Sequence, residues 1–524
     1  MEYLAEEQAE SLGAKTAKMA SYLLLGKLLS FVLLAIAFVV VARVLGPSEY
    51  GVYTLAIAII GIFSAFGSFG IDSATNKFVS EYVAKREPDK IGPLISNSLY
   101  IVLAVGVVLT IVAFAAAGPI AVQAMHAQGY QYLVEIASII VLISMVFYVS
   151  YSALVGYGNG RRVGVAIITQ AAFQSSFSVA LVLLGFGALG PIIGLIAGML
   201  AGASVSLYYI FIGGNAHASA PDRREMSRIL HFSLPIAGSN VITSLVSNLT
   251  MVILGLLATS IIVGNFGVAS KLGSMVDIVI GSISISLISA FSSVSQSKDS
   301  GKRSSAFFNS AIHYAMIFSA PMLLFIAVLA KPFSYVAFSG VYSLAPMYML
   351  IMSLGILVGL VGSYASVMFI SSGKTRRLFK YNAIMSAVQI VSIPFLIYYF
   401  GGDGAAMVLY VVGPVVADVL YLYGIRKHIG VKLSFGKTYR TVLAGIVSAA
   451  LILPITLVES NYIVLLAVAF VEQILIYPVI LVYFGGADRG DLKGITRMTR
   501  GVPLVGSTVA LLSSYAELFI HSRE

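Results

Sequence analysis

Long runs of apolar residues, separated by short polar segments, dominate the chain. A helix needs roughly 20 residues to cross about 30 Å of bilayer hydrocarbon, and fourteen runs reach that length. The pattern predicts an all-α protein with these membrane-spanning helices: 20–45, 51–75, 94–117, 131–155, 163–187, 189–212, 231–257, 262–292, 307–330, 344–370, 381–400, 404–425, 441–458 and 461–484. The fifth and sixth spans, and the eleventh and twelfth, are joined by short glycine-rich segments.

The composition supports an integral membrane protein. Hydrophobic residues make up 59% of the chain and charged residues 10%, which leaves too little polar surface for a water-soluble domain. The chain has no cysteine, so disulfides and thiolate metal sites are excluded, and its six histidines are scattered without ligand spacing. We therefore expect no metal, redox chemistry or cofactor. The acidic start MEYLAEEQAESLGAKTAK and the long first apolar run indicate that the first span is retained rather than cleaved.

Basic residues alternate between the two sides of the predicted membrane. The N-terminus, the loops after even-numbered spans and the C-terminal tail hold 28 of the 32 lysines and arginines, and the other loops hold only Arg43 and Lys331. This asymmetry predicts that both termini lie in the cytoplasm, at the cell membrane. The net charge of +10 then reflects topology and affinity for anionic membrane lipids, and no nucleic acid partner is expected.

The remaining two basic residues, Lys27 and Lys271, lie inside spans. An ammonium in hydrocarbon costs several kcal/mol unless it reaches water or an opposite charge, so both are candidate functional residues. Lys27 lies in the inner half of the first span and could instead extend along its alkyl stem to the inner interface. Lys271 lies deeper, among polar neighbours.

Small and polar residues recur every three or four positions in several spans, which puts them on one helix face. The candidate cavity residues in these stripes are Ser30 in span 1; Thr54, Ser68 and Asp72 in span 2; Asn240, Ser244 and Asn248 in span 7; and Ser270, Ser274 and Asp277 in span 8. Such stripes indicate either close helix packing or a hydrated cavity. For the glycine ridge of span 6, at 190, 194, 198 and 202, we infer packing. The acids Asp72 and Asp277 favour a cavity for spans 2 and 8, where they would balance the lysines or couple the cycle to ions.

Two further acids lie deep in predicted spans, Asp418 in span 12 and Glu472 in span 14. Each is a possible ion or proton site, or a neutral carboxylic acid satisfied by packing.

The chain also looks duplicated. The segments VLGPSEYGVYTLA and SIIVGNFGVASKLG place Tyr50-Gly51-Val52 against Phe266-Gly267-Val268, six spans further on. Repeats of this kind form the two halves of many transporters, which alternate in access around a central site. The predicted organisation is an interfacial helix at 1–19, an N-lobe at 20–215, a C-lobe at 216–430, two added spans at 431–485 and an interfacial tail at 486–524.

The segments ARVLGPSEYGVYTLA and GIDSATNKFVSEY closely resemble the opening motif of polysaccharide and lipid-linked oligosaccharide flippases, a branch of the multidrug/oligosaccharidyl-lipid/polysaccharide exporter superfamily. The resemblance implies two pseudo-symmetric six-helix lobes forming a V-shaped central cavity, with two extra C-terminal helices. It also implies that Lys27 and Lys271 bind the phosphate of the substrate. Many relatives have an arginine where this chain has Lys77.

The function implied is not enzymatic: it is movement of a polyprenyl-(pyro)phosphate-linked oligosaccharide from the inner to the outer leaflet. Glycosyltransferases or a glycan polymerase or ligase are further candidate partners. Three alternatives remain. A cation-coupled multidrug exporter shares the fold, although that branch usually has an acidic residue in span 1. A membrane glycan polymerase or ligase needs a charged external platform, and the external loops are nearly uncharged. A non-transporting scaffold needs no polar stripes.

Overall fold

The computed structural model describes residues 2–68, 70–125, 128–213, 217–274, 276, 300–458, 461–499 and 505–520. Every regular element among these residues is helical. The chain divides into two compact units, Met1–Gly264 and Asn265–Glu524. The lobe boundaries expected from the sequence, with the first lobe ending at 215, remain a prediction.

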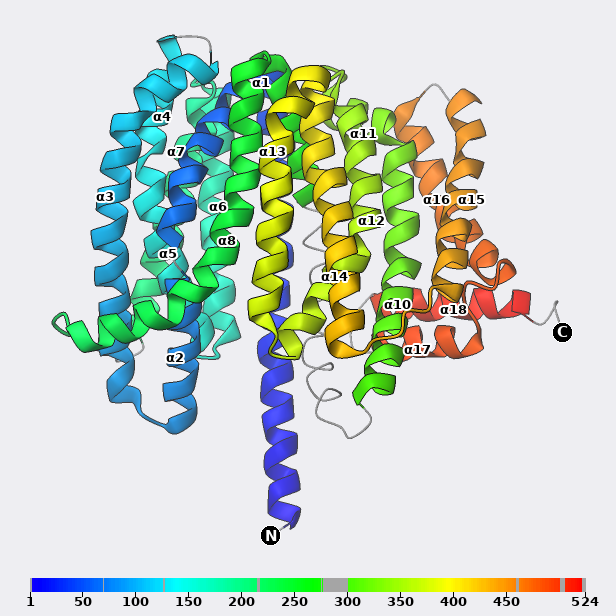
Figure 1. The fold of residues 1–524 in the computed structure, drawn as a ribbon, viewed down its shortest axis with the longest axis horizontal. Coiled ribbons are helices and arrows are strands. Elements are labelled where there is room, and N and C mark those ends of the chain that lie inside the picture. Colours follow the sequence, from blue (N-terminus) through cyan, green and yellow to red (C-terminus); the bar gives the residue numbers. More distant parts are fainter. Residues whose placement is uncertain are drawn as a thin grey trace. The chain divides into compact units, whose positions relative to one another are not determined.

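The first unit is a bundle of long helices (Figure 1). In it α1 packs against α6 and α8, α3 against α5, and α6 against α7. The helices are α1 (Glu2–Ser68), α2 (Ile71–Lys85), α3 (Ile91–Met125), α4 (Gln131–Ala137), α5 (Ile139–Gly156), α6 (Gly160–Leu183), α7 (Leu189–Leu207) and α8 (Arg223–Leu257), with shorter turns at Pro88–Lys90, Gln128–Tyr130 and Tyr208–Ile212.

The second unit contains a second helical bundle and a C-terminal pair of helices. In it α10 packs against α12 and α15, α12 against α14, and α16 against α15 and α18. After the helical residues 265–274, the elements are α10 (Ser300–Val328), α11 (Ala330–Phe338), α12 (Ala345–Ser371), α13 (Thr375–Met407), a π-helical turn (Val408–Val412), α14 (Gly413–Ile429), α15 (Gly436–Val458), α16 (Tyr462–Tyr483), α17 (Arg489–Thr499) and α18 (Val505–Ile520). Figure 1 shows α18 running across the long helices α10 and α15.

Ten segments of the described chain are long and apolar enough to cross a membrane. Eight of them, such as Pro88–Ala121 and Ala345–Ser371, each coincide with one predicted span. The other two, Leu25–Gly67 with 43 residues and Thr375–Ile429 with 55, each contain two predicted spans. Since 43 helical residues extend about 65 Å, such a segment is long enough to cross the hydrocarbon twice. The seventh predicted span appears as a shorter apolar helix at Val241–Leu257, and most of the eighth lies outside the described residues.

The junctions inside the two long segments differ from the expected loops. Backbone angles leave the helical region at Gly46, with φ 68° and ψ 175°, and at Gly401, with φ 54° and ψ −126°. Positive φ strains any residue that carries a Cβ, so glycine is suited to both positions. Pro47 follows Gly46 and cannot continue the hydrogen-bond ladder of the preceding helix. Each pair of spans is thus separated by a break at a glycine rather than by an extended loop.

The glycine ridge of α7 packs closely against α6, as inferred from its spacing. A Cβ on Gly194 would lie 2.0 Å from Oγ of Ser178, and one on Gly198 would lie 2.7 Å from the carbonyl oxygen of Gln170. The ridge therefore lets the two helix backbones approach more closely than any larger residue would allow.

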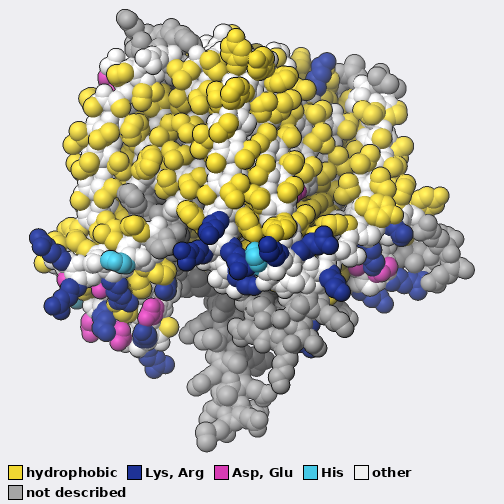
Figure 2. Space-filling model, viewed as in Figure 1, with side chains coloured by type: hydrophobic (Ala, Val, Ile, Leu, Met, Phe, Trp, Pro, Cys, Tyr) yellow, Lys and Arg dark blue, Asp and Glu magenta, His cyan; other side chains and the backbone are white. Residues whose placement is uncertain are grey.

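Basic side chains gather at one end of the helices in each unit, and the rest of the visible surface is largely apolar (Figure 2). In the first unit they follow α2 and begin α6 and α8; in the second they begin α13 and α15 and end α14. This arrangement agrees with the charge asymmetry of the loops. The two aromatic residues aligned as a repeat have partners in different predicted spans: Tyr50 pairs edge-on with Phe38 on α1, in the first span, and Phe266 pairs edge-on with Tyr348 on α12, in the tenth.

Candidate functional site

Lys27 lies on the first half of α1 with its side chain exposed. The neighbouring Gly26 faces α6, where a Cβ in its place would lie 2.8 Å from Cα of Gly164. This close contact shows that the face of α1 carrying Gly26 packs against α6. Lys27 is the next residue along the helix, so its side chain points away from that face. Ser30, one turn further along, is buried, and its hydroxyl has no hydrogen-bond partner among the described residues.

A cavity of about 560 Å³ lies beside this contact, between α1 and α6. Its walls are apolar apart from Tyr22 and Arg161, and Lys27 is not among its lining residues. The structure thus places one of the two predicted phosphate-binding lysines, Lys27, outside the lining of this pocket.

The polar stripes of α8 and the second half of α1 meet. Oδ1 of Asn248 lies so close to Gly61 that a Cβ there would be 2.3 Å away. Asn248 also donates to the backbone oxygen of Ser244, at 2.8 Å, and Thr54 donates to that of Tyr50, at 2.7 Å. At these positions the small and polar residues serve helix packing, and their hydrogen bonds stay within their own helices.

Asp72 belongs to a different helix from the one predicted. α1 ends at Ser68, Gly70 has a left-handed conformation, and Asp72 lies in the first turn of α2. The backbone N–H groups of Ser73 and of Asp72 itself favour the ionised form of this carboxylate. A carboxylate at a helix N-terminus stabilises the free N–H groups and the positive end of the helix dipole. The predicted second span, 51–75, is therefore two helices, and Asp72 does not lie on the same helix as Thr54 and Ser68.

In the second unit, Lys271 is exposed on the helical stretch 265–274. Ser270 has a buried hydroxyl without a hydrogen-bond partner among the described residues, whereas Ser274 donates to the backbone oxygen of Lys271 at 2.7 Å. The side chains of Ser68 and Asn240, and the whole of Asp277, lie outside the described residues.

The two deep acids have contrasting surroundings. Oδ1 of Asp418, on α14, accepts a hydrogen bond of 2.6 Å from the backbone N–H of Gly362 on α12. Only a glycine permits this approach, because a Cβ at 362 would lie 2.2 Å from that oxygen. Both carboxylate oxygens of Glu472, on α16, are buried and have no hydrogen-bond partner in the described part of the chain. Asp418 is thus held in place by a partner, and Glu472 is not.

One charged cluster was missed by the sequence reasoning. His313 on α10 and Asp491 on α17 are both buried, with Nε2 of the imidazole 3.5 Å from Oδ2 of the carboxylate. Lys437 at the start of α15 donates to Asp491 at 3.0 Å and to Asp488 at 2.5 Å. Burial would raise the pKa of Asp491, but the nearby imidazole of His313 and hydrogen bonds from the backbone N–H of Asp488 and from Lys437 outweigh it and hold that pKa below its usual range. His313 was the available signal, as an ionisable residue inside a predicted span.

No group of three or more histidine, cysteine, aspartate or glutamate residues with metal-binding geometry occurs among the residues that the structure describes.

Solved structures share this fold. A lipid II flippase, MurJ, in an inward closed conformation superposes with a TM-score of 0.72 at 14% identity, covering 88% of this chain and 98% of that one. An inward-facing multidrug resistance MATE transporter of the MOP superfamily superposes with a TM-score of 0.67 at 18% identity, covering 76% and 94%. The protein is therefore a multi-pass integral membrane protein with the MOP transporter fold.

The sequence comparisons identify the family. A family model described as "Polysaccharide biosynthesis protein" matches residues 16–295, and the chain belongs to this family. Among curated proteins, the succinoglycan biosynthesis transport protein ExoT of Rhizobium meliloti (strain 1021) is 23% identical over 307 residues. That match covers 58% of this chain and spans only 59% of the relative. The family resemblance expected from the opening motif is confirmed.

Proposed function

We propose that this protein is a flippase that moves a polyprenyl-(pyro)phosphate-linked oligosaccharide from the inner to the outer leaflet for polysaccharide or glycoprotein assembly. The family membership of residues 16–295 carries this proposal, because the family belongs to polysaccharide biosynthesis and the fold is that of transporters. A lipid-linked glycan has a tail that stays in hydrocarbon and a polar part that does not, so it requires a protein path.

The proposed path follows the two-lobed plan: fourteen spans, a V-shaped cavity between six-helix lobes, both termini cytoplasmic and alternating access. The sequence similarity of the segments around Tyr50 and Phe266 supports a repeat of this kind. On this proposal the protein performs no covalent chemistry, and glycosyltransferases or a glycan polymerase or ligase act before and after it.

Lys27 and Lys271 are the proposed phosphate-binding residues. Both have exposed side chains, so each ammonium is available to act as a point charge toward a phosphate. Ser30 and Ser270, one turn from Lys27 and beside Lys271, supply buried hydroxyls without a hydrogen-bond partner among the described residues. The remaining stripe residues would line the path, and Asp418 and Glu472 would be ion or proton sites.

The test is transbilayer movement of a fluorescent polyprenyl-diphosphate oligosaccharide in proteoliposomes, read by protection from an external glycosidase. We expect Lys27→Gln and Lys271→Gln each to slow movement by about tenfold or more, since a charge-assisted hydrogen bond contributes about 1.5–3 kcal/mol. Arginine at either position should partly restore it. Lys331→Gln is the matched control, because Lys331 is an exposed lysine on α11 outside the stripes.

Two results would contradict the proposal. Normal movement in both glutamine variants would refute the phosphate-binding assignment while leaving the flippase intact. Absence of glycolipid movement in the wild type, together with ion-driven efflux of soluble cations, would favour the multidrug exporter, whose fold this chain shares.

A further inference from the structure

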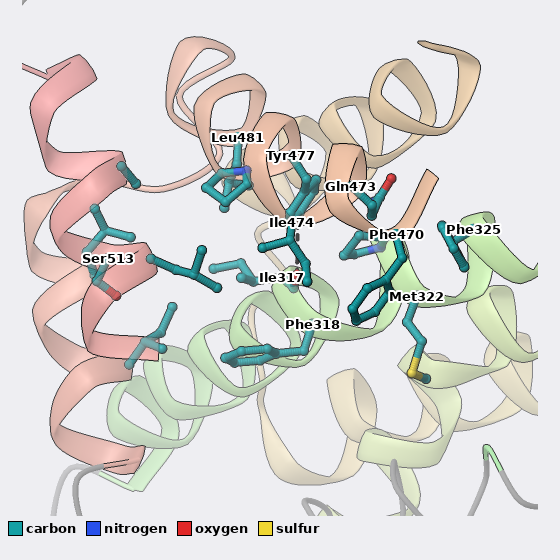
Figure 3. Close-up of a pocket in the computed structure, with 16 residues that line it drawn as sticks. Ile317, Phe318, Met322, Phe325, Phe470, Gln473, Ile474, Tyr477, Leu481 and Ser513 are labelled. Atoms are coloured by element: carbon teal, nitrogen blue, oxygen red, sulfur yellow. Dashed lines mark hydrogen bonds between the residues drawn. The ribbon is translucent and has the colours of Figure 1, made fainter. Parts of the chain in front are cut away.

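An apolar pocket of about 460 Å³ lies in the second unit, between α10, α16 and the C-terminal helices α17 and α18 (Figure 3). Its volume falls in the range that accommodates small ligands. Phe318 and Phe470 line it and are 42% and 58% exposed, so the pocket reaches the outer surface of α10 and α16. Because both helices are candidate membrane spans, hydrocarbon rather than water adjoins that surface.

The C-terminal helices form the remaining wall of the pocket. α17 contributes Leu492 and Ile495, and α18 contributes Ser513 and Ala516. The contacts of Asp491 with His313 and Lys437 attach α17 to α10 and α15. This charged cluster, together with apolar packing of Leu492, Ile495 and Ala516, holds the C-terminal wall of the pocket in place.

One polar group inside the pocket lacks a partner. Gln473 is only 9% exposed, and its Oε1 accepts a hydrogen bond of 3.1 Å from Ser448. Its Nε2 has no hydrogen-bond partner among the described residues, although Gln473 lines the pocket. An unmade hydrogen bond of a buried amide is unfavourable, so an occupant with an acceptor such as an ester oxygen would be favoured over a plain alkane.

The polar face of α17 carries positive charge next to the pocket. Lys493 is exposed and lies between the two pocket-lining residues Leu492 and Ile495 in sequence, which makes α17 amphipathic with a basic outer face. Arg489 lies four positions before Lys493, one helical turn away on the same side of α17. Helices of this type lie at the membrane surface and bind anionic headgroups.

We propose that this pocket binds one acyl chain of an anionic glycerophospholipid from the surrounding membrane, with its phosphate on the basic face of α17. The lipid is a bound component of the second unit and not the transported substrate. Its chain fills an apolar volume that water would occupy unfavourably, and its charge matches that of the helix forming the wall.

The absence of tryptophan from the chain makes a direct test possible. Phe325→Trp places a single fluorophore at the pocket, where Phe325 is partly buried, and Phe395→Trp places one on α13, where Phe395 is 63% exposed. Each variant of the full chain is reconstituted in phosphatidylcholine vesicles with increasing fractions of phosphatidylglycerol brominated on its acyl chains, which quench tryptophan on contact.

We expect the pocket tryptophan to reach half-maximal quenching at a brominated phosphatidylglycerol fraction at least threefold below that of the Phe395 control. With brominated phosphatidylcholine, the tryptophan at position 395 should instead reach half-maximal quenching at the lower lipid fraction, because this control residue is more exposed to bulk lipid. Adding Lys493→Gln to the pocket variant should remove most of the preference for the anionic lipid. Adding Ser513→Leu, which fills the pocket, should weaken quenching by both lipids; intact folding is verified by thermal unfolding.

Other outcomes overturn the proposal. Equal half-quenching fractions for the two tryptophans would mean that the pocket has no bound lipid. If the preference for the anionic lipid persisted in Lys493→Gln, the basic face of α17 would not be the site that binds the lipid phosphate. If polyprenyl phosphate at a few mole percent reversed the quenching and unbrominated phosphatidylglycerol did not, the pocket would belong to the substrate's tail rather than to a phospholipid.

Discussion

Nε2 of His313 lies 3.5 Å from Oδ2 of Asp491, a contact between α10 and α17, whose residues are far apart in the sequence. Both side chains are buried, and Tyr314 and Lys437 also reach Asp491, at 3.4 and 3.0 Å. A buried carboxylate surrounded by donors from two other helices fixes the position of the helix that carries it. This cluster is therefore the main polar attachment of the C-terminal helices to the second unit.

Replacing Asp491 by asparagine should loosen this attachment. Asparagine cannot balance the charge of Lys437, so we expect the free energy of unfolding to fall by about 1–3 kcal/mol. The measurement is thermal or denaturant unfolding in detergent. Glu81→Gln is the control: its partner Lys85 is only 2.6 Å away, but that pair is exposed to solvent and should contribute much less than the buried cluster. Equal losses in the two variants would mean that the buried cluster has no special role.

The contribution of Asp491 to the free energy of unfolding should depend on pH in a defined direction. Since the folded state lowers the pKa of Asp491, its stabilisation is complete above the unfolded carboxyl range, near pH 4, and is lost as pH falls through the lower folded pKa. The groups that face Asp491 are His313, Tyr314, Lys437 and Asp488. The stability difference between wild type and Asp491→Asn should therefore not shrink between pH 8 and pH 5. A difference that disappears by pH 6 would contradict this assignment.

Hydropathy alone predicted most of the spans, for a physical reason. Inside hydrocarbon each backbone N–H and C=O must be bonded within its own segment, so an apolar run of sufficient length has almost no alternative to a helix. The predicted run 344–370 and the observed Ala345–Ser371 agree to one residue at each end. Hydropathy also located both junctions, since Gly46 and Gly401 fall between predicted spans, but it did not predict that each break would be a single glycine with positive φ.

The site residues show the limit of reasoning from helical periodicity. Asp72 shares the spacing of the stripe on α1, yet Gly70 starts a new helix before it, and a helix-face argument does not survive such a break. The contact between His313 and Asp491 joins residues from distant parts of the chain, so local spacing could not reveal it. A histidine in an otherwise apolar span was the only clue, and it pointed to a buried partner of opposite charge.

The glycine ridge of α7 gives a prediction about stability. A Cβ on Gly194 would lie 2.7 Å from the backbone nitrogen of Ser178 and 2.8 Å from the backbone oxygen of Gln174. Backbone atoms cannot rotate away, so Gly194→Ala should force α6 and α7 apart and cost about 1–3 kcal/mol of unfolding free energy. Gly436→Ala is the matched control, because a Cβ there meets nothing within 4 Å. Unchanged stability in Gly194→Ala, measured by thermal unfolding in detergent, would contradict the close packing.

Asp418 allows the proposed ion or proton coupling to be separated from packing. Asparagine at this position keeps an oxygen acceptor for the N–H of Gly362, now 2.6 Å from the carboxylate, while it removes the charge. If Asp418 carries the coupling ion or proton, Asp418→Asn should fold normally and yet lose the response of glycolipid movement to an imposed pH or ion gradient, by about tenfold in initial rate.

Gly362→Ala should reproduce that loss by a different route, because its Cβ would lie 2.2 Å from Oδ1 and displace the carboxylate. Glu135→Gln serves as the control, since Glu135 lies near the outer end of its span and is already bonded by Gln131 at 2.6 Å. The measurement is glycolipid movement in proteoliposomes with and without the gradient. A gradient response that persists in Asp418→Asn and disappears only in Gly362→Ala would mean that Asp418 is a packed acid joining α12 to α14, and that the coupling site lies elsewhere.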